Sequence, residues 1–135
     1  MKRFSLFSIS LLVAIFACVV SIQGSAPDSQ IKEYKEFHDV LHPLEHEALP
    51  KKDYESVRTK ADELVRLGNA IIKLGVPRGT QPSRVQAFEQ ELENFNKALK
   101  YFSKVSKSGK DEDLRISFSA VHDSYEMLAG MLPRG

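Results

Sequence analysis

Four stretches of the chain repeat apolar residues at intervals of three and four, and this spacing constrains the fold more than any other feature. The clearest repeat is Phe88, Leu92, Phe95, Leu99 and Phe102. The others are Ile31, Tyr34, Phe37, Leu41, Leu44 and Ala48; Val57, Ala61, Leu64, Ala70 or Ile71, and Leu74; and Leu114, Phe118, Val121, Tyr125 and Leu128. Such spacing puts apolar side chains on one face of an α-helix, and no segment alternates as a strand does. The sequence therefore predicts an all-α fold.

Proline, glycine and capping residues indicate where these helices begin and end. The expected stops are Pro50, Gly75 with Pro77, and Gly109. The expected N-caps are Asp53, Asp111 and Ser83, the last in a capping box with Gln86. Each helix should have about 20 residues and span roughly 30 Å. Because short connections favour antiparallel neighbours, residues 25–135 are expected to form an up-down-up-down four-helix bundle.

The start of the chain predicts export. Met1-Lys2-Arg3 is basic, and residues 4–22 are almost wholly apolar or small, as in a secretory signal peptide. No cluster of Lys or Arg follows that would stop transfer across the membrane. We expect a signal peptide over residues 1–24, with cleavage after Gly24 rather than Ala26, and a periplasmic protein. In a second interpretation, Cys18 carries a lipid anchor, although Phe16 is bulky for an attachment box.

Composition narrows the chemistry of the mature chain. The only cysteine, Cys18, lies in the predicted signal, so the rest has no disulfide, thiolate ligand or covalent haem attachment. Without Lys2 and Arg3, 17 basic residues remain against 18 acidic ones, with both signs mixed along every segment. This balance predicts neither a nucleic-acid partner nor a polybasic membrane patch. We expect a monomer or a weak homodimer.

The histidines are clustered. His38, His42 and His46 follow one another in steps of four, and His122 lies four residues before Glu126. Residues four apart share a helix face, and antiparallel packing would bring His38 level with His122 at the edge of the core. Imidazole with carboxylate suits Zn²⁺, Cu²⁺, Ni²⁺ or Fe²⁺ better than Ca²⁺ or Mg²⁺. These five residues are the predicted metal ligands.

Pro43 interrupts this run of histidines. It cannot donate a hydrogen bond to the carbonyl of Asp39, so the helix should kink here or end and restart. In a straight helix, His42 and His46 turn progressively away from the apolar stripe. A kink could return His46 to the bundle, or both side chains could simply face solvent. The plain alternative to a metal site is a solvated helix face that happens to contain histidines.

Two motifs surround the predicted ligands: F-H-x-V-L-x-P-L-x-H-x-A-x-P-x-x-D-Y over residues 37–54, and V-H-x-x-Y-E over residues 121–126. They resemble those of a group of small exported bacterial helical proteins. The resemblance implies a metal-binding role for His38, His46, His122 and Glu126, which match recurring positions; His42 matches none. Members often continue past the fourth helix, whereas this sequence stops at residue 135. The plan is also similar, in architecture alone, to four-helix cytochromes of the c-prime and b562 type.

The leading functional prediction is a periplasmic transition-metal-binding protein that sequesters, delivers or senses the ion. Neutral imidazoles would bind it more tightly as the pH rises through about 6 to 7. One alternative is electron transfer by a non-covalent haem on His38 and His122, with Met127 nearby. Another is a structural or partner-binding bundle without metal, although we expect the Phe88 to Phe102 stripe to pack in the core.

An enzyme is not expected. The sequence has no Glu-x-x-His of a di-iron bundle, no His-Glu-x-x-His of a zinc protease and no Gly-x-Ser-x-Gly turn of a serine hydrolase. Tyr54, Tyr101 and Tyr125 are interpreted as packing residues whose hydroxyls face water.

Overall fold

A computed structural model describes residues 31–134, so the predicted signal peptide and Cys18 lie outside the described residues. Within that range the chain forms four α-helices: α1 (Lys32–Pro43), α2 (Tyr54–Leu74), α3 (Pro82–Ser108) and α4 (Asp111–Met131). A π-helical turn, η1 (Leu44–Ala48), continues α1. The described part of the chain contains no strand, which confirms the all-α prediction.

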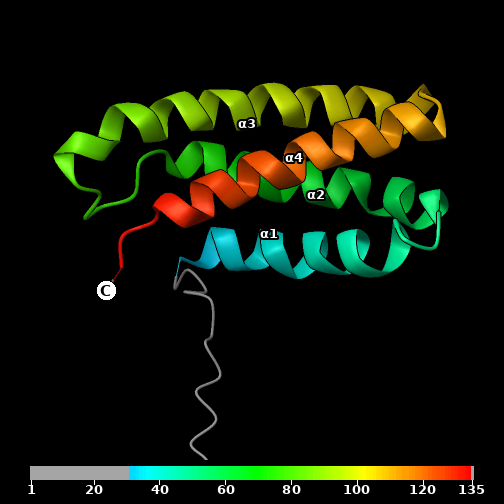
Figure 1. The fold of residues 1–135 in the computed structure, drawn as a ribbon, viewed down its shortest axis with the longest axis horizontal. Coiled ribbons are helices and arrows are strands. Elements are labelled where there is room, and N and C mark those ends of the chain that lie inside the picture. The colour runs from blue at the N-terminus through cyan, green and yellow to red at the C-terminus, as the bar shows by residue number, and fades with distance from the viewer. Residues whose placement is uncertain (1–30, 135) are drawn as a thin grey trace, which may run out of the picture.

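The helices lie along the long axis of the molecule (Figure 1). The α1–α2 and α3–α4 connections lie at one end, and the α2–α3 connection lies at the other, where α4 also ends. α3 and α4 pack together most extensively, followed by α2 with α3 and α1 with α2. Between residues 31 and 134, no helix is both long and apolar enough to cross a bilayer.

The predicted stripes form the core. The largest fully buried side chains come from every helix: Tyr34, Phe37, Leu41, Leu64, Ile71, Phe88, Phe95, Leu99, Phe102, Phe118, Leu114 and Leu128. Burial of each such aliphatic or aromatic side chain contributes about 1.5–3 kcal/mol, and this is what holds the helices together. The phenylalanines of α3 therefore pack inside the protein. The assignment of Leu74 to the core is wrong, because this last residue of α2 is 40 % exposed.

Several predicted helix ends are confirmed. Asp53 is the N-cap of α2, and its Oδ1 accepts a hydrogen bond from the Ser56 amide at 3.1 Å. The Ser56 hydroxyl donates to Oδ2 at 2.6 Å, and these two bonds lower the pKa of the Asp53 carboxyl. Gly75 ends α2 with φ +70°, a conformation that glycine adopts at little cost, and Gly109 ends α3.

Two predicted N-caps are wrong. α3 begins at Pro82 after Gln81, so Ser83 already lies in the first turn and forms no capping box. Proline favours the first helical position because its φ is already helical and its missing N–H would have no partner there. α4 begins at Asp111, with Lys110 as its N-cap.

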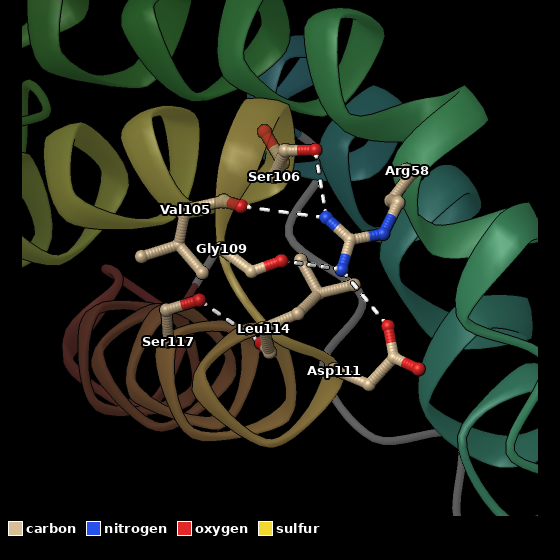
Figure 2. Close-up of polar contacts among 7 residues, drawn as sticks. All are labelled: Arg58, Val105, Ser106, Gly109, Asp111, Leu114 and Ser117. Carbon is tan, nitrogen blue, oxygen red and sulfur yellow. Dashed lines mark hydrogen bonds and ion pairs between the residues drawn. The ribbon is translucent and has the colours of Figure 1, made fainter.

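Arg58 joins α2 to the ends of α3 and α4 (Figure 2). Its Nη1 donates to the carbonyl oxygens of Ser106 at 3.0 Å and Val105 at 3.4 Å. Its Nη2 donates to the Gly109 carbonyl and to Asp111 Oδ1, both at 2.9 Å. The last carbonyls of a helix lack partners within the helix and carry partial negative charge. Arg58 therefore acts as a distant C-cap for α3.

Replacing Arg58 should lower stability well beyond the loss of one surface ion pair. We expect Arg58→Met to reduce the free energy of unfolding by about 2–3 kcal/mol, because several charge-assisted hydrogen bonds are lost together. Asp111→Asn removes only the exposed pair and should cost less than about 1 kcal/mol. Urea unfolding followed by circular dichroism measures both. Equal losses in the two variants would contradict the capping role.

Candidate metal-binding site

The chain passes through Pro43 without breaking. α1 runs directly into η1, and the Leu49 amide donates to the Leu44 carbonyl, five residues back, at 3.0 Å. Pro43 has no N–H for the Asp39 carbonyl, and the wider turn accommodates that missing donor. The turn also keeps Leu44 buried against the bundle. The expected kink or restart is thus a local widening of one continuous helix.

The three α1 histidines form a row along this helix. The ring centroids of His38 and His42 are 5.2 Å apart, and those of His42 and His46 are 4.3 Å apart. His42 and His46 are exposed, whereas His38 is half-buried and its ring centroid lies 6.2 Å from that of Tyr125. His46 is therefore not returned to the bundle by a kink at Pro43, and both His42 and His46 face solvent. We call these three residues the histidine row.

The ring spacing within the row suits two imidazoles that share one ion. When each nitrogen lies about 2.0–2.1 Å from a metal, N–metal–N angles of about 90–110° separate the ring centroids by about 4.5–5.3 Å. The 5.2 Å separation of His38 and His42 lies within this range, and the 4.3 Å separation of His42 and His46 lies just below it. Because His42 and His46 are exposed, their rings can rotate without disturbing the core. The row can therefore offer two nitrogens at a time, with His42 in either pair.

The other two predicted ligands are placed differently. His122 is half-buried on α4, with its Nδ1 3.3 Å from Asp123 Oδ1, and Glu126 is exposed. Among residues 31–134, no three His, Cys, Asp or Glu side chains gather so that they could hold a metal ion. The structure thus brings His38, His42 and His46 into a row but does not combine the five residues into one preformed centre.

Tyr125 connects α4 to α1 beside this row. Its hydroxyl donates to the Tyr34 carbonyl at 3.0 Å, and its ring centroid lies 5.0 Å from that of Phe37. The side chain is only 3 % exposed, so the expectation that its hydroxyl faces water is wrong. With Tyr125 opposite residues 34–38, His122 lies one helical turn away from that contact. Aromatic rings fill this part of the bundle, and Met127 is 59 % exposed, an arrangement that does not favour a haem slot.

Two buried polar groups near the histidine row could not be predicted from the sequence. The Tyr34 hydroxyl is buried without a hydrogen-bond partner, and burial raises the pKa of this phenol above its usual value. Glu45, which precedes His46, has a buried Oε2 that also lacks a partner. Neither could be anticipated, because burial of a single polar atom depends on how neighbouring helices pack.

The stability of the protein should respond differently to loss of the Tyr125 hydroxyl and of the Tyr34 hydroxyl. We expect Tyr125→Phe to lower the free energy of unfolding by about 0.5–1.5 kcal/mol, because a buried hydrogen bond is lost. Tyr34→Phe should be neutral or stabilising, because it removes a buried hydroxyl that has no partner. The midpoints of thermal unfolding of both variants, compared with that of the unmodified protein, measure these changes in stability. A larger loss in Tyr34→Phe than in Tyr125→Phe would show that the hydroxyl roles are assigned wrongly.

Compared with protein-family models, with curated proteins and with solved structures, the chain matches none. The resemblance to small exported bacterial helical proteins stays a prediction. The candidate site therefore depends on the residues and contacts of this chain alone.

Proposed function

We propose that this protein binds transition-metal ions reversibly through the histidine row. The observation that carries the proposal is the pair of ring separations, 5.2 Å and 4.3 Å, along one continuous helix. His42 belongs to both pairs, so it is the central ligand of the site. The negative charge of Glu45, next to His46 in η1, adds attraction for a cation.

The choice of metal follows from the ligands. For nitrogen sites the affinity of divalent ions rises from Mn²⁺ to Cu²⁺ and falls again at Zn²⁺. We expect Cu²⁺ to bind most tightly, with Ni²⁺ and Zn²⁺ weaker. Only neutral imidazole is a ligand, so acidification should release the ion.

The exposure of the row supports delivery or sequestration rather than a structural role. Structural zinc sites are closed by four protein ligands, whereas two imidazoles leave coordination positions for water or for groups of another protein. An ion held in this way can pass to an acceptor without unfolding the carrier. His122 and Glu126 would contribute only after side-chain rearrangement, so their removal should affect binding less than removal of His42.

The proposal also includes the fold topology and the compartment. An antiparallel up-down-up-down bundle is supported by the alternation of the helix connections between the two ends of the molecule (Figure 1) and by the α1–α4 contact through Tyr125. Periplasmic export is supported by the basic start and the apolar stretch over residues 4–22. Removal of the signal peptide on export would also remove Cys18, so histidine and carboxylate side chains would be the metal ligands.

Titration of the purified protein with Cu²⁺ against a competing chelator tests the function. We expect one ion per chain and a Kd that His42→Ala weakens by about tenfold or more, because a helical two-histidine site loses one of its two ligands. His122→Ala is the matched control and should change the Kd by less than about threefold. Binding that is unaffected by His42→Ala, or that depends mainly on His122, would refute the assignment to the row.

A further inference from the structure

A pocket of about 410 Å³ opens at one end of the molecule. It lies where the α2–α3 connection, the first turn of α3 and the segment after α4 meet, and Figure 1 shows these parts at the same end. The volume falls within the range of about 300–1,000 Å³ that is usual for small-molecule sites. None of the residues predicted from sequence to bind a ligand lines it.

The charge of this pocket has one sign. Arg84 from α3 and Arg134 from the C-terminal segment line it, and no acidic residue does. Across the described part of the chain, neither guanidinium forms an ion pair, in contrast to Arg58 and Arg115. Two arginines that have no ion-pair partner among residues 31–134 lie on one concave surface and attract an anion, and their planar donors suit phosphate or carboxylate oxygens.

The start of α3 adds positive electrostatic potential to the same surface. Gln81, the N-cap of this 27-residue helix, makes no side-chain capping bond, and the first turn contains no acidic residue. The first turn of α4, by comparison, contains three acidic residues, Asp111, Glu112 and Asp113. Pro82 has no N–H, and the Arg84 amide donates to the Gln81 carbonyl at 2.8 Å, so this helix end adds mainly its positive dipole to the field of the two arginines.

Packing holds the walls of the pocket in place. Gly79 has φ +91°, and a Cβ built on it would lie 3.7 Å from Pro133 Cβ, so the connection runs close beside the C-terminal segment. The Thr80 hydroxyl donates to the Pro77 carbonyl at 2.7 Å within the same connection. Leu132 is buried at 8 % exposure and, with Met131, gives the pocket an apolar side.

We infer that this pocket binds a small organic phosphate. The phosphoryl oxygens would lie between Arg84 and Arg134 at the start of α3, and the organic part would contact Met131 and Leu132. The cavity is larger than a bare ion requires, and its apolar side gives an organic group a surface to cover. This site is separate from the histidine row and does not depend on the metal-binding function.

The test measures binding of phenyl phosphate, inorganic phosphate and benzoate to the metal-free full chain by isothermal titration calorimetry. Arg84→Gln and Arg134→Gln change the pocket. Arg66→Gln is the matched control, because Arg66 is exposed on α2 and does not line the pocket. Circular dichroism melting confirms that each variant is folded.

Phenyl phosphate should bind more tightly than inorganic phosphate or benzoate. Each pocket variant should weaken it by about tenfold or more, and Arg66→Gln by less than about twofold. Equal weakening by Arg66→Gln would overturn the proposal, since it would reveal a general charge effect. Inorganic phosphate or benzoate binding as tightly as phenyl phosphate would overturn the organic-phosphate assignment, and so would absence of binding.

Discussion

The hydrogen bond from the Tyr125 hydroxyl to the Tyr34 carbonyl links the last helix to the first. α1 packs mainly on α2, and α4 packs mainly on α3, and this hydrogen bond and the ring of Phe37 join α1 directly to α4. His38 is half-buried beside this contact, with its ring centroid 6.2 Å from that of Tyr125. The net contribution of such a bond is modest, about 1 kcal/mol, but it also satisfies a phenol that would be costly to bury alone.

The second constraint is the missing N–H of Pro43. If the helix ended at Pro43, Leu44 and Ala48 would no longer be held on its buried face. The π-helical turn keeps both side chains in the core and lets the histidine row continue to His46. The exposed positions of His42 and His46 follow from this continuity. The proposed metal site would therefore be open to ions in solution and would leave coordination positions free, and both properties would suit the proposed role as a carrier.

Much of the fold could be predicted from sequence because the burial of each helix is periodic and local. In α3, for example, the seven-residue spacing of the phenylalanines is enough to predict which face of the helix is buried: Phe88, Phe95 and Phe102. What could not be predicted depends on partners far along the chain: Arg58 reaches carbonyls 47–51 residues away, and the Tyr125 hydroxyl bonds a residue 91 positions earlier. The sequence shows that Pro43 must disturb the hydrogen bonds of the helix, but whether the helix breaks or widens depends on the packing of Leu44. The histidine row along α1 could be predicted from the four-residue spacing, whereas the absence, among residues 31–134, of one preformed centre that includes His122 and Glu126 depends on side-chain packing.

The most direct test of the proposed metal site is an NMR titration of the histidine ring signals with substoichiometric Cu²⁺, because the paramagnetic ion broadens only nearby nuclei. If the ion binds the histidine row, the His42 signal should broaden first, together with that of His38 or His46, and the His122 signal should persist. Initial broadening of His122, or uniform broadening of all four histidines, would contradict a site on the histidine row.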